Sequence, residues 1–364
     1  MLSSLLKERF LFVGLAAAIV AYASEHSLLA MGRLPVLAAA FALVVAIVLV
    51  STRIAHHAEI LASKVGDPYG TMILTLSAVL VEVVILAIMM QGETSPTLVR
   101  DTIYAAVMLD INGILGLAAL LGGIRHGEQP YNDDSGKTYG VMILTAMGIS
   151  MVVPEFVPRE SWHLYSAFTI GAMIALYALF LRMQVGAHSY FFSYAYPRAE
   201  RKEGMASKAP DENEPATLSI LVIVIGVVLI GALAEVMSVL LGAGLKGSGA
   251  PPALMAVVVA AISAAPEILT ALRAALANRM QSVVNIAMGA SLSTVILTVP
   301  VMEAIALYTG QPFVMAMSPT QTVMVAITLI AAAINLNDGE TNAIEGMTHF
   351  ILFATFIMLT LIGL

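Results

Sequence analysis

Eleven apolar stretches, most of them about 20 residues long, restrict the fold of this chain more than any other feature. A helix of that length crosses the hydrocarbon of a bilayer and satisfies its own backbone hydrogen bonds there. Charged residues make up 11% of the 364 residues, against about 25% in a typical soluble domain. We therefore predict an all-α polytopic membrane protein. The predicted spans are residues 10–31, 34–64, 69–91, 98–123, 139–157, 162–185, 217–241, 251–277, 281–307, 319–336 and 345–363.

One long polar segment suggests how the spans are grouped. Residues 197–216 hold nine charged side chains and are typical of a solvated linker. We predict an extra N-terminal helix in residues 1–33, a first five-helix repeat in 34–196, this cytoplasmic linker in 197–216, and a second five-helix repeat in 217–364.

Lysine and arginine predict the orientation. With the N-terminus inside, thirteen of the seventeen lie at cytoplasmic ends. We predict a multi-pass protein of the bacterial inner membrane with a cytoplasmic N-terminus and an outer C-terminus. The first stretch has the outline of a signal peptide but no small-residue cleavage site, so we interpret it as a span. The chain has no cysteine, which excludes disulfides and thiol chemistry.

Two glutamates are isolated within apolar spans. Glu82 is the only charged residue in 71–90, and Glu267 is the only one in 250–272. A carboxylate at such a depth costs several kcal/mol unless it is protonated, paired or bound to a cation, and it usually marks an ion or proton pathway. The alternative is a protonated glutamate that makes one structural hydrogen bond. We predict that Glu82 and Glu267 are the metal- and proton-binding pair.

A second pair of acids suggests an internal repeat. Glu59 precedes Glu82 across a turn, and Glu235 precedes Glu267 across another turn. Corresponding spans lie five apart, an odd number, so the two halves have opposite orientations. This is the pattern of an inverted-repeat transporter with its site at the midplane.

Polar residues near the two glutamates could complete an oxygen-rich site. Pro266 removes a backbone donor directly before Glu267, so we expect a helix break there that frees carbonyls. Hydroxyl and carbonyl oxygens are what a hard cation requires, although hydroxyls in membranes often bond to their own helix instead. The expected supporting residues are Thr75, Ser263, Thr270, Asp110, Asn112, Asn285 and Ser291.

Glu59, Glu235 and His56 are candidates for gating or relaying protons. They would form an acidic vestibule on the cytoplasmic side of the site. The alternative for Glu59 and His56 is a hydrated helix end without a role.

The expected chemistry is competition. Two buried glutamates hold one divalent cation or two protons, because the cation supplies the positive charge that stabilises both ionised carboxylates. When the cation leaves, protons replace it. This competition is a sufficient coupling rule for antiport.

Several motifs resemble one transporter family. They lie in residues 264–267, 278–280, 286–292, 176–192 and 337–346. The chain resembles the calcium/proton exchanger branch of the calcium/cation antiporter superfamily, and most closely the bacterial calcium/proton and sodium(potassium)/proton antiporters. The resemblance implies that Glu82 and Glu267 are the ion-binding carboxylates and that Glu59 and Glu235 are the paired acids of two long gating helices.

The sequence therefore favours a Ca²⁺/H⁺ antiporter, with a Na⁺(K⁺)/H⁺ antiporter as the alternative. An enzyme is disfavoured because neither a His-Glu-x-x-His motif nor a nucleophile elbow is present. We expect no cofactor beyond the transported Ca²⁺ (or Na⁺/K⁺) and H⁺. The expected partners are the lipid bilayer, cations and protons, without nucleic acid, and the oligomeric state stays open.

Overall fold

The chain folds into a bundle of helices, as predicted. The computed structural model describes residues 8–65, 69–91, 95–185, 215–310 and 313–364. Within these ranges, ten helices are long and apolar enough to cross a membrane. An eleventh apolar helix, α13 (Pro319–Asn335), is shorter at 17 residues. Most of the predicted linker lies outside the described residues.

Each predicted span has a helical counterpart. The remaining helices are α2 (Arg9–Ala30), α3 (Arg33–Val65), α4 (Tyr69–Gln91), α5 (Leu98–Val107), α6 (Gly116–His126), α7 (Asp133–Met147), α8 (Trp162–Val185), α9 (Ala216–Leu245), α10 (Ala253–Leu276), α11 (Met280–Ser293), α12 (Val299–Thr309) and α14 (Ala343–Leu361).

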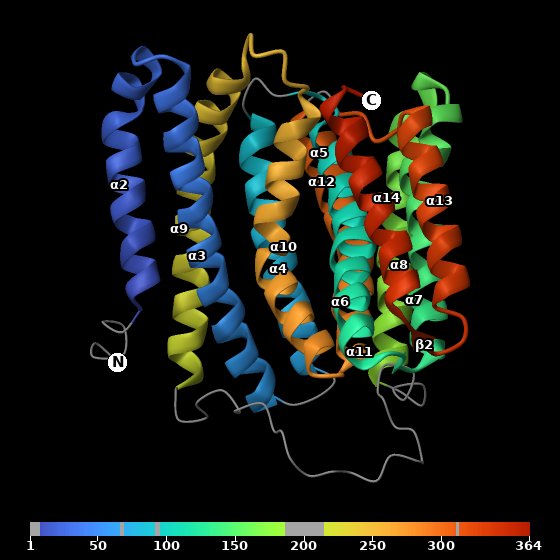
Figure 1. The fold of residues 1–364 in the computed structure, drawn as a ribbon. Coiled ribbons are helices and arrows are strands. Elements are labelled where there is room, and N and C mark those ends of the chain that lie inside the picture. The colour runs from blue at the N-terminus through green and yellow to red at the C-terminus, as the bar shows by residue number, and fades with distance from the viewer. Residues whose placement is uncertain (1–7, 66–68, 92–94, 186–214, 311–312) are drawn as a thin grey trace.

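The helices form two groups with a pair between them (Figure 1). The long helices α3 and α9 pack extensively against each other, with α2 beside both. The helices α4 and α10, which carry the two isolated glutamates, lie between this group and the others. The chain starts its first helix at the lower end in this view and finishes α14 at the upper end.

Two spans contain a wide, π-helical segment at mid-length. The segment η1 (Met108–Leu115) joins α5 to α6, and η6 (Thr294–Thr298) joins α11 to α12. A further π-helical segment, η2 (Gly148–Val152), follows α7. Such segments shift helix register and occur often at functional sites.

A small two-stranded sheet, which the sequence analysis did not predict, lies at the lower end. Strands β1 (Gln129–Pro130) and β2 (Glu340–Thr341) pair antiparallel, with Gln129 opposite Thr341. They connect the loop after α6 to the loop before α14. Short 3₁₀ turns, η3 (Val153–Phe156) and η4 (Arg159–Ser161), connect α7 to α8 at the upper end.

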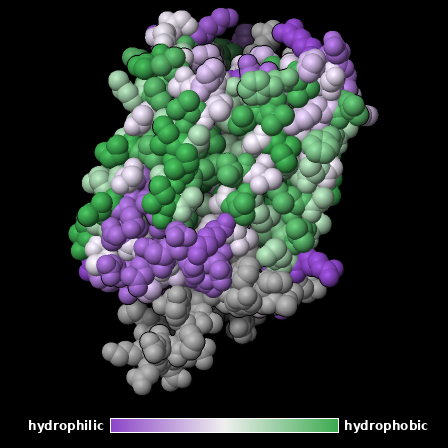
Figure 2. Space-filling model, turned by 90° about the vertical axis from the view of Figure 1, so that its right-hand side faces the viewer, coloured by the Kyte–Doolittle hydropathy of each residue, from purple (hydrophilic) through white to green (hydrophobic). Residues whose placement is uncertain are grey.

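The surface has the polarity expected of a membrane protein. Figure 2 shows a hydrophobic band on one face, with hydrophilic residues gathered toward both ends. Large apolar side chains of α14, such as Ile344, Ile351 and Met358, are also exposed, as expected of a helix that contacts lipid.

Glycines allow α6 and α14 to approach closely. A Cβ added at Gly116 would lie 2.8 Å from the backbone nitrogen of Phe350. One added at Gly346 would collide with the backbone of Ala119 and Leu120. Small residues at helix interfaces permit this kind of contact in membranes.

We predict that Gly346→Ala destabilises the protein by about 1–3 kcal/mol, because the neighbouring atoms are rigid backbone. The measurement is the apparent melting temperature in detergent. Gly171→Ala in α8 is the matched control, since a Cβ there meets nothing within 4 Å. Equal melting temperatures for the two variants would contradict this account of the interface.

Candidate ion-binding site

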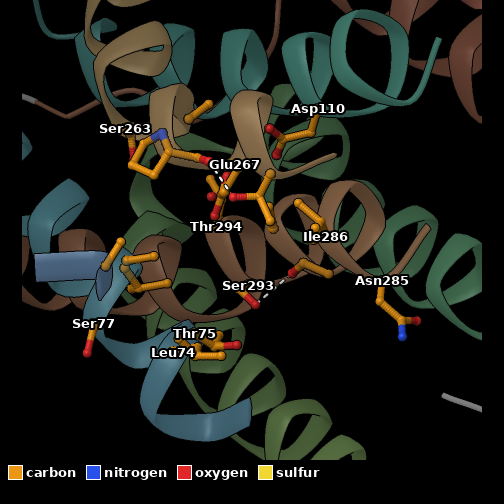
Figure 3. Close-up of a pocket in the computed structure, with 18 of the residues that line it drawn as sticks. Leu74, Thr75, Ser77, Asp110, Ser263, Glu267, Asn285, Ile286, Ser293 and Thr294 are labelled. Atoms are coloured by element: carbon orange, nitrogen blue, oxygen red, sulfur yellow. Dashed lines mark hydrogen bonds between the residues drawn. The ribbon is translucent and has the colours of Figure 1, made fainter. Parts of the chain in front are cut away.

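A cavity of about 760 Å³ lies between the central helices and contains most of the predicted site (Figure 3). Residues of α3, α4, η1, α7, α8, α10, α11 and η6 line it. At one end it is lined by Asp110 and Ser263, near the middle of their spans. At the other end it is lined by the exposed residues Glu59 and Arg279 and by Gln184. These three lie where α3 and α8 end and α11 begins, so the cavity opens at the lower end of Figure 1.

Glu82 lies at the wall of the cavity and is 2% exposed. Its Oε2 accepts hydrogen bonds from the hydroxyls of Thr294 (3.0 Å) and Thr298 (3.1 Å). Its Oε1 is buried and has no hydrogen-bond partner among the described residues. One carboxylate oxygen is therefore held in place, and the other keeps its lone pairs for a proton or a cation.

Glu267 lies in the same cavity on α10. No described residue forms a hydrogen bond with its carboxyl group, whereas Figure 3 shows it near Asp110 and Thr294. The expected helix break at Pro266 is wrong: α10 continues from Ala253 to Leu276. Proline still lacks the N–H that would bond to the carbonyl four residues earlier, so the helix is weakened without being interrupted.

Asp110 is a third carboxyl group in the cavity. It lies on η1, is 2% exposed, and its Oδ2 accepts a hydrogen bond from Ser291 (3.2 Å). Thus η1 contributes an acid, and Ser291 on α11 supports it without lining the cavity itself.

The other predicted supporting residues divide into two groups. Thr75, Ser263, Thr270 and Asn285 line the cavity. The Thr270 hydroxyl donates to the carbonyl of Pro266 (2.9 Å), which is the helix back-bonding considered as the alternative. Its oxygen still has a free lone pair.

Asn112 does not line the cavity. Its Nδ2 donates to Thr328 (2.7 Å), and its Oδ1 lies 2.9 Å from Nδ1 of His349. This buried network joins η1 to α13 and α14. Asn112 therefore anchors the segment that carries Asp110.

The predicted gating residues are separated in the structure. Glu59 lines the mouth of the cavity, whereas Glu235 and His56 do not line it. Glu235 is exposed on the other side of α9, where it accepts a hydrogen bond from the Tyr22 hydroxyl of α2 (2.7 Å).

His57, next to His56, is the buried histidine of α3. Its Nε2 lies 3.3 Å from Glu8, which also receives two 2.7 Å hydrogen bonds from Arg53. Burial alone would raise the pKa of Glu8, but Arg53 and His57 outweigh it and hold that pKa below its usual range. These residues connect α2 to α3.

Sequence reasoning missed several residues of the site. Thr294 and Thr298 are four residues apart, so they share one helix face, and that spacing could have identified them. Tyr139, Gln184 and Arg279 line the cavity only because distant spans meet, which no local pattern reveals.

The arrangement can bind a hard cation or protons. The carboxyl groups of Glu82, Glu267 and Asp110, with that of Glu59 at the mouth, line one cavity together with hydroxyl and amide oxygens. Hard cations prefer oxygen ligands. Within the described residues, no three or more histidine, cysteine or acidic side chains lie close enough together to hold a metal ion by themselves.

Comparison with known proteins identifies the family. The family model described as sodium/calcium exchanger protein matches residues 10–186 and 218–362. The sodium-potassium/proton antiporter ChaA of Escherichia coli is 32% identical over 311 residues, which are 84% of each chain. A Ca²⁺/H⁺ antiporter of Aphanothece halophytica is 25% identical over 280 residues, covering 73% of this chain and 74% of the relative.

A solved structure has the same fold. The structure of YfkE, named a Ca²⁺/H⁺ antiporter, superposes with a TM-score of 0.74 at 16% identity and covers 97% of this chain and 99% of its own. On the extent of the family match and of the relatives' alignments, the chain belongs to the sodium/calcium exchanger protein family of membrane cation exchangers.

Proposed function

We propose that this protein is a cation/proton antiporter in which Ca²⁺ and protons compete for Glu82 and Glu267. One observation carries the proposal: a buried Glu82 oxygen without a partner lies beside a cavity that also holds the unbonded carboxyl of Glu267. Groups of this kind are costly in a membrane unless a ligand neutralises them.

The cost of ionising the two buried glutamates gives the coupling rule. With Ca²⁺ bound, both glutamates are ionised, and the cation offsets their repulsion and desolvation. Without Ca²⁺, protons neutralise the same groups. If the protein changes between its inward-open and outward-open states only when the site is neutralised, each change carries either Ca²⁺ or protons. The result is exchange of Ca²⁺ for protons.

The geometry also supports two inverted repeats. The segment η1 of the first half packs against α10, and Asp110 on η1 binds Ser291 of the second half. The segment η6 of the second half packs against α4, where its threonines hold Glu82. Each half therefore places a π-helical segment against the acidic helix of the other, as expected for a site at the interface of two repeats.

The cavity represents one side of an alternating-access cycle. Its lining reaches the exposed Glu59 and Arg279 at one end only. By the charge distribution of the loops that end faces the cytoplasm. Glu59 would then be the acid that cations meet first.

For this site we favour Ca²⁺ over a monovalent cation. It takes six to eight oxygens and favours several carboxylates. Glu82, Glu267 and Asp110, with hydroxyls and the Asn285 amide, can supply them together with water. A Na⁺(K⁺)/H⁺ antiporter on the same carboxylates is the second candidate, because the E. coli relative at 32% identity is named for that activity.

We predict that Glu82→Gln and Glu267→Gln each reduce Ca²⁺-dependent proton flux by about 100-fold, since loss of a charged ligand removes both the cation and the exchangeable proton. The measurement uses purified protein in liposomes with an internal pH dye. Parallel assays with submillimolar Ca²⁺ and with tens of millimolar Na⁺ or K⁺ separate the two candidates.

Glu25→Gln is the control, because it makes the same change on α2, which does not line the cavity. It should leave the flux unchanged. Near-normal exchange in either cavity variant, with the protein folded, would remove that glutamate from the mechanism.

The threonines that hold Glu82 should tune affinity. We predict that Thr294→Val and Thr298→Val each raise the Ca²⁺ concentration for half-maximal exchange about tenfold, because a hydrogen bond to a charged group contributes about 1.5–3 kcal/mol. Thr360→Val is the control: Thr360 is also buried but bonds only to its own helix, on α14. An equal response in all three variants would contradict a specific role for the Glu82 contacts.

A further inference from the structure

A further buried carboxyl group lies apart from the cavity. Glu303 on α12 is 3% exposed and does not line the cavity. It is the only charged residue between residues 281 and 307, so its own span holds no positive side chain that could compensate it. Nothing in the proposed function uses it.

The burial of Glu303 favours a protonated carboxyl group. No described Lys, Arg or His lies within ion-pair distance of it. Its Oε2 lies 2.6 Å from the hydroxyl of Thr169 on α8. An ionised carboxylate in this setting would cost several kcal/mol, whereas a protonated one can donate its hydrogen to the threonine oxygen.

Thr169 is suited to receive that hydrogen. Its hydroxyl lies 2.9 Å from the carbonyl of Ser166 and 3.2 Å from that of Tyr165. A hydroxyl has a single hydrogen and two lone pairs, so Thr169 can donate to its own helix while it accepts from Glu303. All the groups are then satisfied without a charge.

No other described titratable group near α12 forms a hydrogen bond with Glu303. The helices and segments that pack most against α12 are α8, η6 and α4. Their described titratable side chains are Glu82 on α4 and His163, Tyr165, Tyr177 and Arg182 on α8. No hydrogen bond joins any of them to Glu303, and the Tyr165 hydroxyl donates to the carbonyl of Ile149 (2.7 Å).

Glu303 lies on the same span as the threonines that hold Glu82. One span begins at Met280, beside the cavity mouth. Farther along it, Thr298 donates a hydrogen bond to Glu82, and Glu303 follows five residues later. At 1.5 Å per residue, Glu303 lies roughly 7 Å beyond Thr298 along this span, away from the mouth. Another buried acid away from the mouth, Asp101, is paired with Arg100 at 2.7 Å.

We propose that Glu303 is a second proton-binding site, on the path that protons take between Glu82 and the surface opposite the cavity mouth. The inference rests on the proposed antiport. In each transfer one O–H bond of Glu303 breaks and one O–H bond forms on the ionised carboxylate of Glu82. A proton from water at the opposite surface then restores the O–H bond, so the net charge of Glu303 is unchanged after a cycle.

The test compares two exchange modes in the same liposomes. Exchange of isotopic Ca²⁺ for unlabelled Ca²⁺ requires the cation site but no net proton movement, whereas Ca²⁺/H⁺ exchange requires both. We expect Glu303→Gln to keep Ca²⁺/Ca²⁺ exchange and to lower Ca²⁺/H⁺ exchange by about 100-fold, the low end of what a positioned proton-transfer group contributes. Glu303→Asp should recover part of the loss, and Glu25→Gln should change neither mode.

Every outcome decides the proposal. If Glu303→Gln preserves both modes, or removes both in folded protein, Glu303 has no specific proton role. If the variant does not fold, infrared difference spectra of the wild-type protein decide. A band of a protonated buried carboxyl group must change on Ca²⁺ addition, and it must persist in the Glu82→Gln, Glu267→Gln and Asp110→Asn variants. If wild-type protein shows no cation/proton exchange, the proposed function fails first.

Discussion

The cost of an ionised carboxyl group in a low-dielectric interior controls the architecture of this protein. Glu82, Glu267 and Asp110 are placed where water, a cation or a proton can reach them through one cavity. Only one oxygen of Glu82 is committed to fixed hydrogen bonds. If protein groups made hydrogen bonds to every carboxyl oxygen, no oxygen would be left to bind a cation. If none of the oxygens had a hydrogen-bond partner in the protein, the carboxyl groups would not be held in a defined geometry.

The helices around the site serve this requirement. The two π-helical segments η1 and η6 widen their spans at the depth of the acids and turn polar side chains toward the opposite half of the molecule. Buried contacts farther away hold these segments. Asn112 connects η1 to Thr328 and His349, and the glycines of α6 and α14 bring the two helices close enough for that network to form.

Much of this arrangement could be predicted from the sequence, for a physical reason. Apolar length specifies spans in a bilayer, and an isolated acid in such a span identifies a candidate position; the two acids chosen in this way, Glu82 and Glu267, line the same cavity. The same criterion would have found Glu303, which the sequence analysis passed over. The expected break at Pro266 was wrong because a helix buried among neighbours tolerates one missing hydrogen bond. Local patterns also do not indicate the direction of a side chain, so Glu235, on a helix resembling that of Glu59, lies away from the cavity and contacts Tyr22.

The central claim is that Ca²⁺ and protons occupy the same carboxyl groups. The most direct test is the pH dependence of Ca²⁺ binding to purified protein, measured together with proton release by calorimetry in buffers of different ionisation enthalpy. If cation and protons compete, binding releases protons, and the Kd rises about tenfold per pH unit for each proton released as the pH falls. A Kd that is independent of pH, with no proton release, would contradict the account.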